Sequence, residues 1–150
     1  MASDHAGEEI FILVAERIKQ KKDSLKEVKR YQNTGIEGWL KVEAITALRE
    51  KVKEVRDIGS DLVLQVHENR IELELKAATD FNPSYIKKGA TDHKTMCLFL
   101  GNGSDKEKIE ELMSDKDIKV VSHETFDVNG NKWIIGMIKP SEEYLFHHSD

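Results

Sequence analysis

The sequence contains a single cysteine, so it cannot form an intramolecular disulfide. Cys97 lies in the apolar run 96–100, where we expect a buried strand residue, and its isolation favours a reducing compartment. No apolar run approaches the roughly 20 residues that a membrane-spanning helix needs. Residues 1–7 have neither the basic flank nor the cleavage pattern of a signal peptide. These absences predict a cytoplasmic protein with no membrane partner.

Several motifs that define well-known sites are also missing. The six histidines include no pair at the spacing of a zinc site, and one cysteine cannot complete a structural zinc centre. The glycines match neither the phosphate-binding loop G-x-x-x-x-G-K-[ST] nor the hydrolase motif G-x-S-x-G. There is no internal repeat. Zinc modules, P-loop nucleotidases and serine hydrolases of this type are therefore disfavoured.

The charge of the chain is unevenly distributed. The 150 residues suit one domain, and the net charge is −5. Helical spacing of apolar residues predicts a long helix over about 8–31, and within it residues 17–30 contain seven basic and two acidic side chains. This basic half suits contact with a DNA backbone. The alternatives are a solvated helix face and an intramolecular partner for acidic surface.

The most informative stretch runs from Asp61 to Lys76. Apolar residues alternate twice in it, which predicts two half-buried strands joined by a hairpin turn at about 67–70; they are Leu62, Leu64, Val66, Ile71, Leu73 and Leu75. Pairing Val66 with Ile71 makes one face wholly apolar. In that register Asp61 lies opposite Lys76 on the polar face, with Glu74 on the adjacent diagonal.

Two carboxylates and one lysine at one end of a hairpin suggest a particular chemistry. Neighbouring carboxylates repel each other unless a cation lies between them. Mg²⁺ prefers oxygen ligands, commonly one or two protein carboxylates with water and phosphate oxygens. A bound divalent ion activates water for attack on a phosphodiester, and a nearby lysine stabilises the charge that develops. The group therefore predicts phosphodiester hydrolysis.

The pattern Asp61, a gap of 12 residues, then Glu74-Leu75-Lys76 resembles the PD-(D/E)xK nuclease superfamily, also called restriction-endonuclease-like. The resemblance covers about residues 37–101. It implies that Asp61 and Glu74 bind Mg²⁺ or Mn²⁺, that Lys76 is the catalytic lysine, and that DNA is the substrate. The superfamily often adds a glutamate on the preceding helix, and Glu43 is the candidate for a further metal ligand. A small nuclease of this kind is also expected to form a homodimer.

The fold expected from these features is a single α/β domain. The resemblance implies a restriction-endonuclease-like mixed sheet of about five strands flanked by helices. The core over 37–101 follows an N-terminal helix over 8–31 and precedes a helix and hairpin over 104–140. The helix over 37–55 carries Glu43 away from its apolar stripe, so Glu43 reaches the metal only if that flank faces the hairpin. An exposed glutamate is the alternative.

The second half of the chain follows an alternating order of helices and strands. Pro83 suits the first turn of a helix that reaches Lys88. The continuous apolar run at 94–100 predicts a central strand. A helix over 104–114 and a strand over 119–123 follow. Asn129-Gly130 favours a type I′ turn before a last strand at 133–138.

Three other interpretations compete with an active nuclease. A sheet face in water naturally carries acidic and basic residues, so Asp61, Glu74 and Lys76 could form ordinary surface ion pairs. The fold could also be a catalytically inactive module that binds nucleic acid or a protein partner. In the third interpretation the chain is a structural subunit whose sheet edge or last hairpin forms an oligomer.

Overall fold

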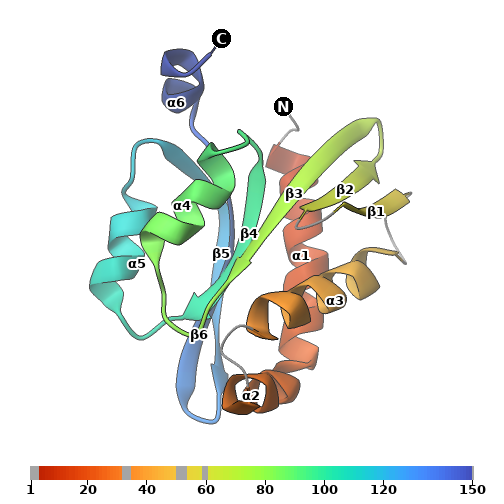
Figure 1. Cartoon of the computed structure of the whole chain (residues 1–150), viewed down its shortest axis with the longest axis vertical. Coiled ribbons are helices and arrows are strands. Elements are labelled where there is room, and N and C mark those ends of the chain that lie inside the picture. The colour runs from red at the N-terminus through yellow and green to blue at the C-terminus, as the bar shows by residue number, and fades with distance from the viewer. Residues whose placement is uncertain (1–3, 32–34, 50–53, 59–60, 150) are drawn as a thin grey trace.

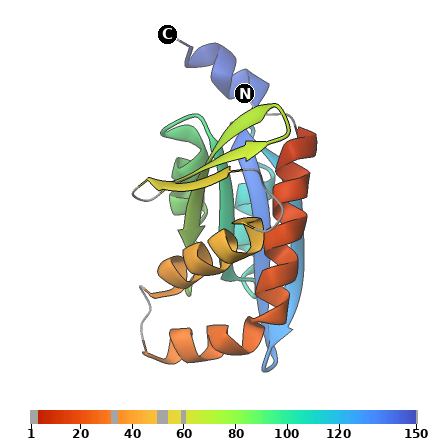
Figure 2. The same ribbon diagram turned by 90° about the vertical axis from the view of Figure 1, so that its right-hand side faces the viewer.

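The structure is a computed structural model that describes residues 4–31, 35–49, 54–58 and 61–149 (Figure 1). A mixed six-stranded sheet, in the order β1-β2-β3-β4-β6-β5, forms the centre of an α/β fold. The helices α1 and α3 cover one face and α4 and α5 the other (Figure 2). In the described part of the chain, no helix combines the length and the apolar character needed to cross a membrane.

The elements follow the chain as helices and strands with these bounds: α1 Asp4–Gln20, α2 Lys22–Tyr31, α3 Gly35–Arg49, β1 Glu54–Ile58, β2 Asp61–Val66, β3 Asn69–Ala77, α4 Pro83–Thr91, β4 Met96–Asn102, α5 Lys106–Met113, β5 Ile118–Val128, β6 Asn131–Pro140 and α6 Glu142–His147. Neighbouring strands are antiparallel except β3 and β4, which are parallel and joined through α4. This crossover brings the end of β3 close to the start of α4.

The prediction of one long N-terminal helix is wrong, because the chain turns at Lys21. The amide of Lys21 donates to the carbonyls of Arg17 and Ile18, which closes α1, and α2 then leaves in a new direction (Figure 2). The turn buries Leu25 completely against the core. Periodicity predicts helical residues but not helix direction, and no glycine or proline marks this turn.

The prediction of a helix over 37–55 is wrong at its C-terminal end. The helix α3 ends at Arg49, and residues 54–58 form the edge strand β1, in which Val55 pairs with Leu64 of β2. Residues 50–53 lie outside the described part. Pairing with β2 satisfies backbone groups along its open edge, and the branched side chains of Val55 and Ile58 favour a strand. Tertiary pairing here outweighs helical spacing.

The β2–β3 hairpin forms as predicted, but its register differs by two residues. The turn contains only His67 and Glu68, with His67 in the left-handed region at φ 55°. Asp61 therefore lies opposite Glu74, rather than opposite Lys76. A two-residue shift keeps every side chain on its predicted face. The six aliphatic residues predicted for the apolar face accordingly belong to one core cluster.

Other predictions for the second half are confirmed. The strand β4 is central and buried along most of its length, and Asn129 and Gly130 both have positive φ, as a type I′ turn requires. The helix α4 begins at Pro83, and the side chain of Asn82 caps it by accepting from the amide of Tyr85. This cap sets the first turn of α4 beside the end of β3.

Candidate functional site

Glu74 and Lys76 lie together on the face of the sheet that α4 covers. Their Oε1 and Nζ atoms are 3.6 Å apart, and only 5% of Glu74 is exposed. Two positions earlier on this face, Arg70 and Glu72 form a looser 3.7 Å pair with both side chains in water. Glu74 is therefore not part of a solvated strand face, and the interpretation as ordinary surface charges does not fit it.

The close approach of α4 to Lys76 depends on a glycine. A Cβ atom built on Gly89 would lie 2.9 Å from Cγ of Lys76 and 2.6 Å from Sγ of Cys97. Real Cβ atoms do not tolerate such distances, so only glycine lets α4 pack on the lysine stem. The stem is thereby held between the sheet and the helix, and the ammonium group extends toward the end of β3.

Two residues that sequence reasoning did not select complete this arrangement. The Nζ atom of Lys76 lies 4.4 Å from the ring centroid of Tyr85, a cation–π distance. The Tyr85 hydroxyl donates to Oε1 of Glu37 at 2.8 Å, and the amide of Ala77 donates to the same oxygen at 3.0 Å. Glu37, from the first turn of α3, thus connects α3, α4 and the end of β3.

The electrostatics of the group favour a charged lysine. Partial burial works to lower the pKa of Lys76, but Tyr85, Glu74 and Glu37 outweigh it and raise that pKa. The pKa of Tyr85 is raised, first by burial and then by its hydrogen bond to Glu37. Lys76 therefore carries its proton at neutral pH and can stabilise negative charge, whereas it cannot serve as a general base there.

An open pocket of about 420 Å³ lies beside these residues. Glu37 and Tyr85 form one part of its wall, and the segment from Ala77 to Asp80 with Asn82 forms the rest. The small side chains of Ala77 at the end of β3 and of Ala78 after it leave this space. A ligand group in the pocket would contact Glu37 and Tyr85, the partners of Lys76, whereas Lys76 and Glu74 do not line it.

Asp61 is placed at the site only by the pairing of its backbone with β3. Its side chain lies outside the described part of the structure, but its backbone pairs directly with that of Glu74. Residues directly opposite in an antiparallel pair have Cβ atoms about 4.5–5.5 Å apart. Among the residues whose side chains are described, no three histidines, cysteines or carboxylates gather as ligands for a metal ion. A metal here would depend on Asp61 and Glu74 as a pair.

Glu43 does not contact Glu74 or Lys76 but forms an ion pair with Arg17. It is 8% exposed on α3, and its Oε1 atom accepts from both Nε and Nη2 of Arg17 on α1, each at 3.1 Å. The pair joins α1 to α3 on the opposite side of the sheet from α4. Of the two glutamates, Glu37 rather than Glu43 is the α3 residue in contact with the surroundings of Lys76.

We expect Glu43→Gln to lower the free energy of unfolding by about 1–3 kcal/mol, because a buried charge-assisted hydrogen bond is lost. It should leave any cleavage activity unchanged. Urea unfolding and a cleavage assay on the same preparation test this. Loss of activity in a variant that is still fully folded would instead support the metal-ligand role predicted for Glu43.

Comparison with known proteins adds no assignment: no family model, no curated protein and no solved structure matches the chain. Function must therefore be inferred from the residues themselves.

The signals that could have pointed to Glu37 and Tyr85 are weak in sequence. Tyr85 is the third residue of a helix whose start the Asn82-Pro83 pair already indicates, so its place near β3 follows from the crossover. Glu37 precedes Glu43 by six residues, which puts it on another side of α3. Only the packing of the helix start against Ala77 distinguishes the two glutamates.

Proposed function

We propose that the protein is a metal-dependent nuclease with a restriction-endonuclease-like core, and that it hydrolyses DNA phosphodiester bonds at Asp61, Glu74 and Lys76. The single observation that carries the proposal is the β2–β3 register, in which Asp61 pairs directly with Glu74, and Glu74 lies beside Lys76. Like charges directly opposite in a sheet are destabilising, and Glu74 is buried, so the pair favours a bound cation.

The donor set fits Mg²⁺ or Mn²⁺. Asp61 and Glu74 would hold the ion, which supplies Lewis-acid activation of water and of the scissile phosphate. Lys76, kept protonated by its neighbours, stabilises the charge on the phosphoryl oxygens. Glu37 and Tyr85 fix the position of the ammonium group and the end of β3. The adjoining pocket leaves room for the substrate strand.

The order of elements also agrees with the family resemblance. A helix (α3), a strand (β1) and a hairpin (β2–β3) precede the parallel strand β4. Asp61 stands at the start of the first hairpin strand, and Glu74 and Lys76 lie on the face of the second strand that α4 covers. The resemblance is thus consistent with the arrangement of residues 35–102.

The test is cleavage of plasmid, single-stranded DNA and RNA with Mg²⁺ or Mn²⁺, and with a chelator as control. Native protein should cleave, and Glu74→Gln should reduce the rate at least ~100-fold. Glu72→Gln is the matched control, because Glu72 lies on the same strand and face but in water. It should retain activity.

Equal activity of Glu74→Gln and native protein would refute the site. Calorimetric titration with Mn²⁺ provides a second readout, since Glu74→Gln should lose binding that Glu72→Gln keeps. Native protein that neither cleaves nor binds Mn²⁺ would favour the alternative from the sequence, an inactive module of the same fold that binds nucleic acid or a protein.

A further inference from the structure

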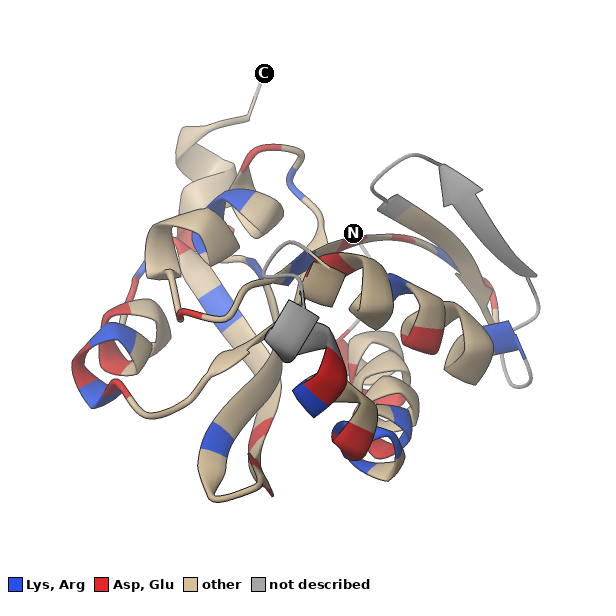
Figure 3. Ribbon diagram, turned by 60° about the horizontal axis from the view of Figure 1, so that its bottom comes forward, with Lys and Arg blue, Asp and Glu red and all other residues tan. Residues whose placement is uncertain are grey.

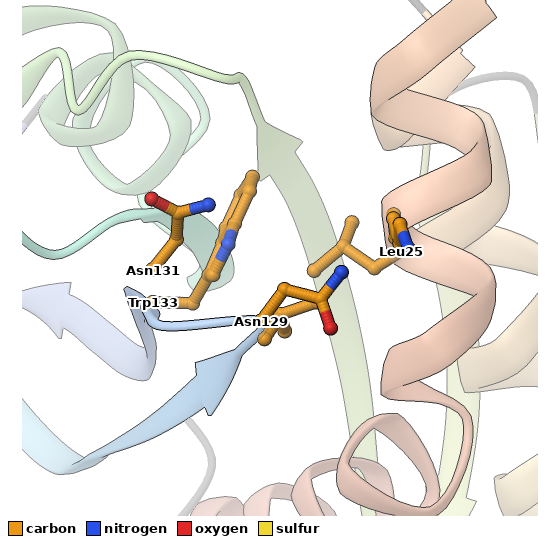
Figure 4. A pocket seen from close by; sticks show the side chains of 6 residues that line it. Leu25, Asn129, Asn131 and Trp133 are labelled. Carbon is orange, nitrogen blue, oxygen red and sulfur yellow. The ribbon is translucent and has the colours of Figure 1, made fainter.

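The helix α2 and the β5–β6 hairpin enclose a small hollow at one end of the molecule. Its volume is about 170 Å³, and Lys26 from α2 and Asn129 and Asn131 from the hairpin contribute polar groups to its lining. Figure 4 shows Asn129 and Trp133 across from Leu25 of α2. Trp133 is only 1% exposed, so it forms the floor and is not available for stacking. A group bound here would meet amides and a lysine.

Two lysines of α2 lie on one side of the helix, and one of them, Lys26, lines the hollow. With 3.6 residues per turn, Lys22 and Lys26 lie on the same side of the buried Leu25, about 60° and 100° around the helix from it, whereas Asp23 and Glu27 fall on the side opposite Leu25. Like charges four residues apart destabilise a helix. Lys22 and Lys26 are exposed, and in the described part of the chain neither is within ion-pair distance of a carboxylate. Nearby Lys19, by contrast, is paired with Glu124 at 3.0 Å.

This surface lies at the same end of the sheet as the proposed active site but on the other face, because Leu25 and Trp133 belong to the core cluster under α1 and α3 whereas Lys76 lies beneath α4. Figures 1 and 3 show α2, the β5–β6 turn, the start of α3 and the segment after β3 at the same end of the molecule. Tyr31 ends α2 and Gly35 begins α3, so their Cα atoms can be at most about 14 Å apart. Glu37, beside the pocket, lies only two residues further. A strand held along α2 would have to pass around this end of the sheet to reach Lys76 on the other face.

We propose that the surface formed by Lys22, Lys26, Asn129 and Asn131 binds the phosphate backbone of nucleic acid. The hollow has room for one phosphate group, to which the two asparagine amides can donate hydrogen bonds while Lys26 supplies charge. Unpaired lysines and amide donors bind backbone phosphates without reading the sequence. The inference rests on the proposed function in taking nucleic acid as the substrate, and it adds the surface that holds the strand.

The test is the binding of a fluorescent 20-base-pair DNA duplex, followed by anisotropy in EDTA at several salt concentrations. No metal is present, so binding is measured without cleavage. Lys22→Glu/Lys26→Glu should weaken binding at least ~10-fold and reduce the slope of log affinity against log salt by about 2. The matched control is Lys106→Glu/Lys108→Glu on α5, also an exposed lysine pair in a helix, with the same change in net charge. It should weaken binding less than ~3-fold.

A milder double variant, Lys22→Gln/Lys26→Gln, shows whether the effect persists if the charge-reversed variant misfolds. Its loss of DNA affinity should lie between those of the native protein and the charge-reversed variant.

Equal weakening of DNA binding in the α2 and α5 variants would overturn the inference, since net charge alone would then explain it. Binding of native protein to phosphatidylserine vesicles but not to DNA would also overturn it. DNA binding that depends on α2 in a protein that never cleaves would support the surface and refute the nuclease. Cleavage by a protein whose DNA affinity does not depend on the α2 lysines would support the nuclease and refute the surface.

Discussion

Replacing Lys76 with methionine should reduce metal-dependent cleavage by about 10²–10³-fold, the usual cost of removing one group that stabilises transition-state charge. Methionine keeps an apolar stem between β3 and Gly89, so the packing of α4 is retained. Because Lys76 is protonated and is not a metal ligand, the loss should appear in kcat, with little change in KM or in Mn²⁺ affinity. Steady-state kinetics and calorimetry measure the three quantities.

The matched control for this prediction is Arg70→Met. Arg70 is on the same strand and the same face, and the substitution removes one positive charge in the same way, but its side chain is exposed and pairs loosely with Glu72. The kcat of Arg70→Met should remain within about twofold of the native value, because an exposed ion pair contributes little free energy. If both variants lose kcat equally, general electrostatics rather than Lys76 governs the reaction.

The contrast between Lys76 and Arg70 also shows what alternation alone can predict. Alternating residues correctly assign both to the polar face of the hairpin, because a strand has a period of two. They cannot show that α4 covers the face at Glu74 and leaves it open at Glu72. The helix α4 packs closely on this part of the face at Gly89, in a contact that involves residues from three elements. The pattern therefore predicts the face, and tertiary packing selects the residues that become buried.

The two-residue error in the predicted β2–β3 register also arises because the alternating pattern fixes only the face on which each side chain lies. Both registers put the same six aliphatic side chains in the core, so burial does not distinguish them. The difference lies in the turn, where His67 adopts a left-handed conformation and allows a two-residue connection. Non-glycine residues seldom adopt this conformation, and a four-residue turn was the simpler expectation. The correction matters for function, since it replaces a carboxylate–lysine pair by two opposed carboxylates.

The C-terminal end of α3 could not be predicted from the sequence, because it depends on a strand that follows later in the chain. The residues from 40 to 55 keep helical spacing, yet Val55 pairs in a sheet. Competition between a local pattern and an open strand edge depends on the partner strand, which lies later in the chain. The Asn129-Gly130 turn was predicted correctly because its conformation is a property of those two residues themselves.

The largest expected effect on stability is at Phe99, the neighbour of Lys76 across the β3–β4 pairing. Its ring is fully buried, meets Phe81 edge-on at 5.9 Å and covers Gly136, where a Cβ atom would lie 2.4 Å from the ring. Phe99→Ala should lower the free energy of unfolding by about 3–5 kcal/mol, through lost burial and the cavity left behind. Urea or thermal unfolding measures it, with Phe146→Ala as the control. Phe146 is 78% exposed, so its truncation should change stability by less than about 0.5 kcal/mol.

Gly136 gives the same contact an independent test. Gly136→Ala should cost about 1–3 kcal/mol, because the added methyl group has no room beneath the ring. In the combination with Phe99→Ala the methyl group enters the space that the ring has left, so the double variant should be more stable than the sum of the two losses predicts. Strict additivity would mean that the two residues do not touch in solution. The supporting layer beneath Lys76 would then differ from the one described, and the close packing of α4 on β3 and β4 would need another explanation.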